Sequence, residues 1–347
     1  MLSVGVAARN EKATLAQTLR SIEVALAALD PPAPAEIIVA VNGSTDRTRE
    51  IAAAYAAAFA GAPRDGVTVR VVGSPPGLIE AQRVIAGLAR SGEHLILVDA
   101  DCVLDPGCLR DLVAAMAEHP EAEAAWATMV PADLHGRPGF WRPVFNFADY
   151  HPDVIRRGRH LCGRAFAVRH YDVAWHAPHR PVTDVDPRTA AYLSLDRGPI
   201  SDDSFLSRAI IDRHGPGAIH HAATARVVFQ PIPRLRDFTR AQRRKSYEAH
   251  RLDLLFPEWR GVRRRHFRRE IDAAAHARLR PVQRLQCRLY LLLYALSGRL
   301  AALRLRAGLT LVRLGVPLRP CEVWPVVDGT KRPFTGAAAP RPPAPAG

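Results

Sequence analysis

An apolar run followed by a helical pattern occurs four times in the first third of the chain, and this alternation constrains the fold more than any other feature. The runs at 2–8, 36–41 and 95–99 lack polar alternation, which is typical of strands covered on both faces of a sheet. Strands that alternate with helices form parallel sheets with right-handed crossovers. We therefore expect an α/β fold with a Rossmann-like, mostly parallel sheet flanked by helices. The expected strands are residues 2–8, 36–41, 67–72 and 95–99.

Composition points to a reducing compartment. The 347 residues suffice for one large domain or two modest ones. The five cysteines are scattered without a Cys-x-x-Cys pair, so neither a zinc site nor a disulfide framework is expected. We expect a cytoplasmic protein.

The chain is strongly basic, with a formal net charge of +14, and its basic residues concentrate after residue 230. A cationic surface attracts nucleic acid, anionic lipid or phosphorylated substrates. The charge alone does not choose among these partners.

The fourth apolar run ends in two carboxylates one residue apart, Asp99 and Asp101. Residues two apart on a strand point to the same side, so both side chains can converge at the edge where open α/β sheets bind ligands. Two hard oxygen ligands suit Mg²⁺ or Mn²⁺ carrying a phosphate. The alternative is an ordinary strand end, with Asp105-Pro106 capping the next helix.

Four polar motifs follow one another in order: Asn10-Glu11 after the first strand, the turn 42–46 after the second, Asp99-Ala100-Asp101, and Ser201-Asp202-Asp203 opening a later helix. This series resembles the family 2 glycosyltransferases of the GT-A fold, over roughly residues 2–245. The resemblance implies a metal-dependent, inverting transfer of a sugar from a nucleotide-diphosphate sugar to an acceptor hydroxyl.

The resemblance also assigns roles. Asp203, together with Asp202, is expected to act as the catalytic base, since adjacent carboxylates raise each other's pKa. Asp101 is expected to bind the metal, with Asp99 on the metal or on the ribose. Asp46 is expected to cap the following helix. Further nucleotide-sugar contacts are expected from Ala8, Arg9, Glu11, Asn42, Gly43, Ser44 and Ala100.

Weaker expectations concern the acceptor and the diphosphate. Gly163 and Arg164 resemble the loop and strand beside the acceptor pocket. Arg83 either reaches the diphosphate or faces solvent. Gln242 and Lys245 stand where some family members carry Gln-x-x-Arg-Trp, and they either hold the diphosphate or lie on a solvated helix face. Lys245 and the serine after it replace Arg and Trp, which argues against a processive polysaccharide synthase.

Two details leave the donor and the metal ligands open. The turn of the family often reads Asp-Asp-Gly-Ser, whereas Val41 and Asn42 stand at those aspartate positions here. The turn therefore does not identify a uridine diphosphate sugar as the donor, and a guanosine or thymidine diphosphate sugar is also a candidate. His220-His221 could complete a metal site or belong to a polar surface.

The expected organisation is a nucleotide-sugar half (1–130), an acceptor-binding half of the same domain (131–233), a basic helical extension (234–335) and a disordered tail (336–347). The apolar run 289–296 is too short to cross a membrane. With Leu300, Leu303 and Leu305 it could form an amphipathic helix on a bilayer or pack on the catalytic domain. A position at the inner membrane face and a lipid-linked or cell-envelope acceptor therefore stay open.

Two other functions compete with glycosyl transfer. A sugar-phosphate nucleotidyltransferase needs a glycine-rich N-terminal loop, and residues 7–11 contain no glycine. A non-catalytic module that binds nucleic acid or a lipid surface is supported by the charge. The presence of all four acidic motifs argues against it, and we expect no nucleic-acid partner.

Overall fold

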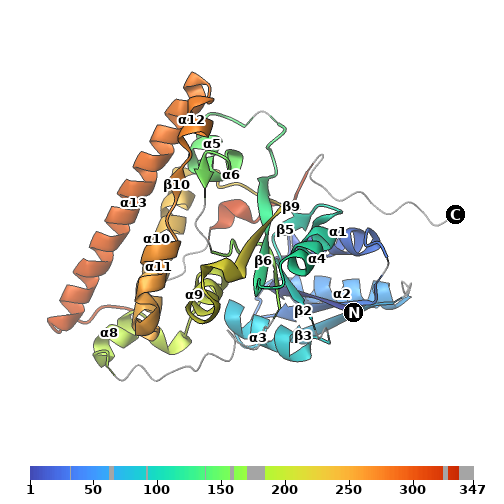
Figure 1. The fold of residues 1–347 in the computed structure, drawn as a ribbon. Coiled ribbons are helices and arrows are strands. Elements are labelled where there is room, and N and C mark those ends of the chain that lie inside the picture. The colour runs from blue at the N-terminus through green and yellow to red at the C-terminus, as the bar shows by residue number, and fades with distance from the viewer. Residues whose placement is uncertain are drawn as a thin grey trace.

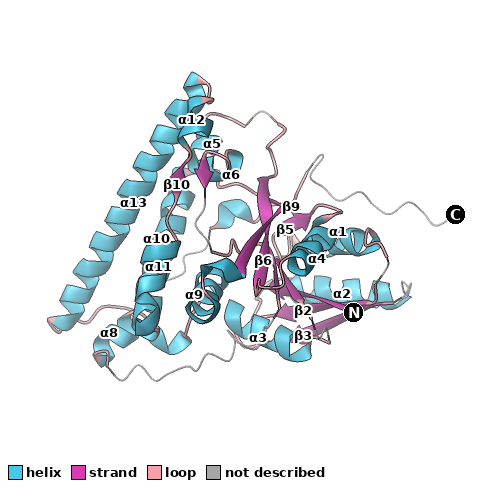
Figure 2. Cartoon of the chain, in the orientation of Figure 1, coloured by secondary structure: helices cyan, strands magenta, loops and turns pink. Residues whose placement is uncertain are grey.

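A computed structural model describes residues 1–31, 33–61, 66–90, 93–136, 138–156, 160–169, 184–322 and 327–335. An eight-stranded mixed sheet forms the centre of the molecule, and helices cover it (Figures 1 and 2). A group of long helices stands beside the sheet, on the left in Figure 1.

The strand order is β3-β2-β1-β4-β8-β6-β9-β5. The first four neighbours run parallel, whereas β8 runs antiparallel to both β4 and β6, and β5 antiparallel to β9. A separate ladder pairs β7 (Ile155–Arg156) with β10 (Glu270–Ile271). The strands of the large sheet are β1 (Leu2–Ala8), β2 (Ala35–Val41), β3 (Val67–Gly73), β4 (Leu95–Asp99), β5 (Cys102–Leu104), β6 (Ala124–Pro131), β8 (Ala165–Val168) and β9 (Ile219–Phe229).

Both faces of the sheet are covered, which explains the apolar runs without alternation. In β2, Ile37 and Val39 belong to one core and Ile38 and Ala40 to the other. Helices α1 (Leu15–Ala27), α2 (Thr48–Gly61) and α4 (Cys108–Glu118) supply the first core, and α3 (Leu78–Leu88) and α9 (Asp202–His214) the second.

The C-terminal part is helical. It contains α10 (Leu235–Leu255), α11 (Arg260–His266), α12 (Ala273–Ala277) and α13 (Pro281–Arg313), with α13 lying along α10. In the part of the chain that the structure describes, no helix combines the length and apolar character needed to cross a bilayer. The short helices are α5 (Trp141–Phe145), α6 (Phe147–Tyr150), α8 (Pro187–Tyr192), η1 (Leu195–Arg197), η2 (Pro216–Ala218), η3 (Pro257–Trp259) and η4 (Asp328–Thr330).

The predicted fold class is confirmed, and the four predicted strands agree with β1 to β4 to within a residue. Helix α4 begins at Cys108 after Gly107, without a side-chain cap, so the alternative in which Asp105 caps it is wrong. Leu305, for which bilayer contact and packing on the protein were both open, is buried. The predicted disordered tail lies outside the described residues.

Register brings the polar motifs to one edge of the sheet. Ala7 pairs with Asp99, and Ala8 pairs with Val41, so β1, β2 and β4 end at the same level. Antiparallel β8 begins there, since Ala165 pairs with Val98. The loops that carry the predicted motifs therefore meet at this edge.

Candidate active site

The loops after β1 and β2 are bonded to each other. The side-chain oxygen of Ser44 accepts a hydrogen bond from the Asn10 backbone N–H at 3.1 Å, and Asn10 Oδ1 accepts one from the Thr45 N–H at 2.8 Å. The carbonyl of Ala8 accepts from the Asn42 N–H. The two predicted nucleoside-binding loops thus form one preorganised unit.

Asn42 holds the next loop in place. Its Nδ2 donates to the carbonyl of Gly77 at 3.0 Å, whereas its buried Oδ1 has no hydrogen-bond partner among the described residues. Gly43 adopts a φ of 70°, a left-handed conformation that favours glycine. An acceptor oxygen without a partner at this edge suits a hydrogen-bond donor from a ligand.

Asp46 is structural, as predicted from its position before the helix. Its carboxylate accepts bonds from the backbone N–H of Thr48 at 3.0 Å and of Lys12 at 3.3 Å. Arg83 forms an ion pair with Glu80 one helical turn away, at 2.7 Å. The neighbouring residue of α3, Gln82, contacts Asp202.

Helix α1 fixes the turn that carries Asp99 and Asp101. The hydroxyl of Thr18 donates to the carbonyls of Ala100 at 3.0 Å and of Cys102 at 2.7 Å. The backbone N–H of Asp99 donates to the carbonyl of Arg164 at 2.8 Å. The turn is therefore bonded on both sides.

Arg164 forms an ion pair with Asp101 of this turn. Its Nη1 donates to Asp101 Oδ1 at 3.0 Å, and its guanidinium lies over the Phe229 ring at 4.6 Å. Burial disfavours its charge, but Asp101 and Asp99 outweigh burial and raise the pKa of Arg164. Arg164 thus stays charged inside the site.

Asp202 and Asp203 open helix α9 directly against Gly163. A Cβ at position 163 would lie 2.9 Å from the Cβ of Asp203, so only glycine allows this approach. Gln82 donates to Asp202 Oδ2 at 2.7 Å. Asp203 Oδ1 accepts bonds from the Ser204 N–H at 2.6 Å and from the Ser201 hydroxyl.

The aspartates are close enough to repel one another. Burial, followed by the charges of Asp101, Asp202 and Asp203, raises the pKa of Asp99 well above its ordinary value. Burial and Asp203 raise the pKa of Asp202 to about 7. Such crowding of carboxylates is typical of sites that take up a cation or a proton.

Helix α10 holds the loop in front of the aspartate pair. Glu248 Oε1 accepts hydrogen bonds from the backbone N–H groups of Ile200 at 2.7 Å and Ser201 at 3.2 Å. Its other oxygen pairs with fully buried Arg251 at 2.5 Å. Arg251 in turn donates to the carbonyls of Leu193, Ser194 and Gly198.

Arg244 is a basic residue of the site that the predicted set did not include. Burial lowers its pKa to about 10, while Asp203, Asp101 and Asp99 oppose that shift, which places Arg244 among the aspartates. Of the two predicted residues of this stretch, Gln242 is buried and Lys245 is exposed. Arg244 lies three residues before Tyr247 and four before Glu248, which are both buried. Residues three or four apart share one face of a helix, so the helical spacing of α10 could have identified Arg244 as inward-facing.

Lys331 is a second residue outside the predicted set. Its Nζ lies 2.5 Å from Glu11 Oε1 and donates to the carbonyls of Arg9 at 3.1 Å and Asn10 at 3.2 Å. Residues 327–335, here called the C-terminal strap, are anchored by Gln17, which exchanges two bonds of 2.8 Å with the backbone of Phe334. No local sequence signal marks this lysine.

Glu11 completes the acidic cluster. Burial and the charge of Asp101 raise its pKa to about 7, against the opposing effect of Lys331. Glu11, Asp99, Asp101, Asp202 and Asp203 are therefore electrostatically linked, with Arg164, Arg244 and Lys331 around them.

The donor set fits a divalent cation that also binds a diphosphate. Mg²⁺ is usually held by one or two carboxylates together with phosphate and water oxygens. Asp99 and Asp101 supply two such carboxylates, and burial together with the charge of Asp101 raises the pKa of Asp99. Within the described residues, no three His, Cys, Asp or Glu side chains are grouped to hold a metal by themselves.

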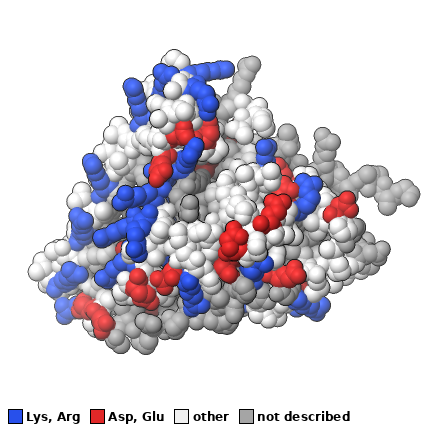
Figure 3. Space-filling model, in the orientation of Figure 1, with Lys and Arg blue, Asp and Glu red and all other residues white. Residues whose placement is uncertain are grey.

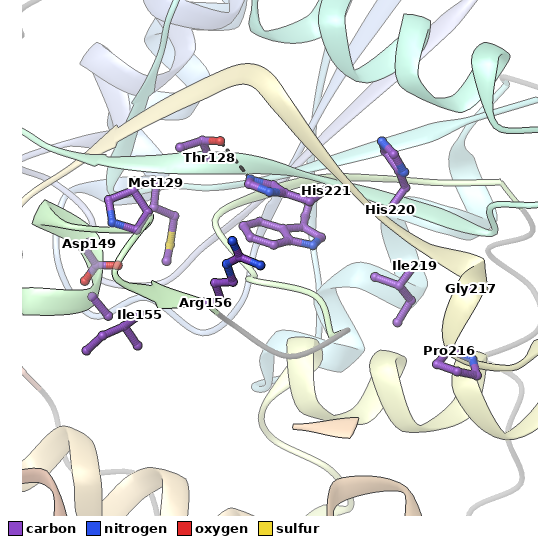
Figure 4. A pocket seen from close by; sticks show the side chains of 13 residues that line it. Thr128, Met129, Asp149, Ile155, Arg156, Pro216, Gly217, Ile219, His220 and His221 are labelled. Atoms are coloured by element: carbon purple, nitrogen blue, oxygen red, sulfur yellow. Dashed lines mark hydrogen bonds between the residues drawn. The ribbon is translucent and has the colours of Figure 1, made fainter. Parts of the chain in front are cut away.

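A cavity of about 500 Å³ lies beside β6 and the start of β9 (Figure 4). Trp126 stacks on His221 at 3.9 Å, and His221 Nε2 lies 2.9 Å from the Thr128 hydroxyl. Asp149 and Arg156 also line the cavity, and the charge of Asp149 acts on Arg164. His220 stacks on His119, so the two histidines have ring partners of their own.

Residues 3–174, just under half of the chain, match the family model described as glycosyl transferase family 2. No curated protein sequence matches the chain. The family match covers β1 to β8 and thereby the Asp99–Asp101 turn and Gly163.

Solved structures resemble the chain at low identity. Residues 1–349 of TarS from S. aureus are 16% identical, with a TM-score of 0.40, and the match covers 95% of this chain and 89% of TarS 1–349. Glucosyl-3-phosphoglycerate synthase from Mycobacterium tuberculosis is 17% identical, with a TM-score of 0.42, covering 74% and 80%. GalNAc-T7, solved with UDP, GalNAc and Mn²⁺, is 17% identical, with a TM-score of 0.42, covering 66% and 42%. We take no residue role from likenesses this distant.

Proposed function

We propose that this chain, a glycosyltransferase with a family 2 domain in residues 3–174, moves a sugar from a nucleotide-diphosphate sugar to an acceptor hydroxyl with inversion at the anomeric carbon. The observation that carries the proposal is the placement of Asp99, Asp101, Asp202 and Asp203 at one sheet edge, where the loop of Gly163 and Arg164 contacts both aspartate pairs. Such a cluster combines a cation site with a proton acceptor, and glycosyl transfer to a hydroxyl needs both.

The nucleotide is proposed to occupy the bonded loops after β1 and β2. Ala8, Arg9, Gly43, Ser44 and Ala100 supply backbone and small side chains along this edge. The oxygen of Asn42 that lacks a partner would accept a bond from the base, and Glu11 would accept one from the base or ribose. Uracil, guanine and thymine are the candidate bases of the donor nucleotide.

The charge of the diphosphate would be neutralised by Mg²⁺ or Mn²⁺ bound to Asp101 and Asp99, together with nearby basic side chains. When bound, the cation would stabilise the negative charge that develops on the leaving diphosphate. Arg244 and Lys331 lie within the same electrostatic network and supply fixed positive charge. Gln242 and Arg83 are weaker candidates, and Lys245 is weaker still because it is exposed.

Asp203 is proposed to take the proton of the acceptor hydroxyl. Both of its hydrogen bonds from described residues end on Oδ1, which leaves Oδ2 as the oxygen for the proton. Asp202, held by Gln82, precedes it in the first turn of α9. Gly163, just before β8, allows the backbone there to approach Asp202 and Asp203 closely.

The cavity beside β6 is the proposed acceptor side. It is linked to the acidic cluster through Arg164 and Asp149, and it combines an indole, a hydroxyl, a carboxylate and a guanidinium. These groups suit a hydroxylated acceptor. We propose a cytoplasmic, non-processive enzyme, and all five cysteines being free supports that compartment.

A thermal-shift panel of UDP, GDP and TDP, each with and without Mn²⁺, tests the proposal. Binding to the native state raises Tm by mass action, so the preferred base is the one with the largest metal-dependent rise. Asp101→Ala should abolish the metal-dependent part, and the matched control Asp105→Ala should keep it. The proposal fails if no nucleotide shifts Tm while the chain binds nucleic acid in a strongly salt-dependent way.

A further inference from the structure

One face of α13 is uncovered and carries a line of leucines. The spacings of seven, four, four and three residues place them on one stripe of the helix. The opposite face packs against α10, α5 and α8. The exposed leucines, here called the leucine face, are Leu285 (50% exposed), Leu292 (53%), Leu296 (45%), Leu300 (55%) and Leu303 (59%).

Arginines flank the leucine face, and the whole helix lacks acidic residues. α13 contains six arginines and no Asp or Glu over its 33 residues. Arg299, Arg306 and Arg313 recur every seven residues along one side of the leucines, and Arg304 lies on the other side. All four are exposed.

Two aromatic residues lie beside the first turns of this helix. Gln286 Nε2 donates to the carbonyl of Phe140 at 3.1 Å, which fixes the chain there. Phe140 is 36% exposed and the neighbouring Trp141 is 55% exposed. Tryptophan is enriched at membrane–water interfaces.

We propose that the leucine face of α13 lies flat on an anionic membrane surface. The 33 residues span about 50 Å, and the helix occupies the outer edge of the molecule in Figure 1, away from the sheet. Figure 3 shows many Lys and Arg side chains on that same side, with Asp and Glu side chains near its upper and lower ends. Leucines enter the acyl boundary while flanking arginines meet anionic headgroups.

The charges favour lipid over a second copy of the chain. In a dimer through this face, the arginines of two helices would be brought together, and α13 offers no carboxylate to compensate. Nucleic acid would satisfy the arginines but would leave the leucines exposed to water. An anionic bilayer satisfies both sets of side chains at once.

Co-sedimentation with vesicles of phosphatidylcholine alone, or with 30 mol% phosphatidylglycerol (roughly the anionic fraction that recruits basic helices), tests the inference. We expect binding to the anionic vesicles only, weakened at least about fivefold between low and high salt, because screening shortens the reach of the arginines. The assay contains no donor or acceptor, so its outcome is independent of the transfer reaction.

Two sets of variants separate the apolar and the electrostatic contributions. Leu296→Glu with Leu303→Glu should reduce vesicle binding at least about tenfold, and Arg299→Gln with Arg306→Gln about tenfold. The matched controls are Leu134→Glu with Leu235→Glu and Arg47→Gln with Arg110→Gln, which change exposed residues elsewhere. Unchanged Tm values and nucleotide binding show that the variants fold.

Equal binding to neutral vesicles, or wild-type binding by both α13 variants, would overturn the inference. Light scattering supplies the other decisive outcome. The leucine face would instead be a contact between two copies of the chain if two results came together. The wild type would be a dimer that does not bind vesicles, and Leu296→Glu with Leu303→Glu would make it monomeric.

Discussion

Lys331 lies 2.5 Å from Glu11, although 320 residues separate the two in sequence. The contact brings a cation from the C-terminal strap into the loop proposed to hold the nucleotide. Glu11 is also coupled to Asp101, so this lysine acts on the same charge cluster as the proposed cation site.

Replacing Lys331 with methionine should weaken binding of the preferred nucleoside diphosphate about tenfold, because one charge-assisted interaction is worth about 1.5–3 kcal/mol. Isothermal titration with Mn²⁺ present measures the change. Arg332→Met is the matched control, since the adjacent side chain is exposed and should leave affinity unchanged. Equal affinity in both variants would remove Lys331 from the donor site.

Asp203→Asn should keep donor binding and lose turnover by a factor of about 10² or more, as expected when a general base is removed. Asparagine retains an oxygen at Oδ1 for Ser201 and Ser204, so the start of α9 should persist. Donor turnover and nucleotide affinity are measured on the same preparation, with Asp212→Asn at the far end of α9 as the control. Wild-type turnover would move the base to Asp202 or elsewhere.

The support of the catalytic loop by Glu248 predicts a large stability difference between two similar ion pairs. Glu248→Ala should cost about 3–5 kcal/mol, because it leaves buried Arg251 without its charge partner. Glu50→Ala removes the glutamate of an exposed Arg47 pair with the same spacing in sequence, and should cost at most about 1 kcal/mol. Urea unfolding of both variants measures the difference, and similar losses would contradict the assignment.

The pKa of Asp202 predicts a pH dependence of stability. Its folded pKa of about 7 lies above the ordinary value of 3.8, so the protonated form stabilises the fold at low pH. That stability is lost as pH rises through about 7. The Tm of the wild type relative to Asp202→Asn, without ligands, should therefore fall between pH 5 and 8.5. A constant difference would show that Asp202 titrates near its ordinary value.

Strands β1, β2 and β4 could be predicted because each is buried on both faces and therefore reads as an apolar run. Strand β3 lies at the edge of the sheet and is only partly buried, and its valines gave the signal there. Strand β9 has no apolar run along its whole length, since its first half, from Ile219, mixes histidine with alanine and threonine. The meeting of Asp99 with Asp202 follows from motif order, because the proposed family supplies the topology that a single sequence lacks.

The basic side of the site could not be predicted in the same way. Arg244 and Lys245 are neighbours, and only the phase of α10 against its buried face decides which one points to the aspartates. Lys331 belongs to a short segment without periodicity, and its partner Glu11 lies at the other end of the chain. Contacts of this kind depend on tertiary packing alone.

The C-terminal strap also has a consequence for the order in which the protein is made. Residues 3–174, which match the family model, leave the ribosome well before Lys331 is synthesised. Until the strap pairs with Gln17 and Glu11, the nucleotide loop lacks its anchoring lysine. The nascent chain can therefore form the parallel part of its sheet, β1 to β4, early, while the proposed donor site is completed only when residues 327–335 have emerged.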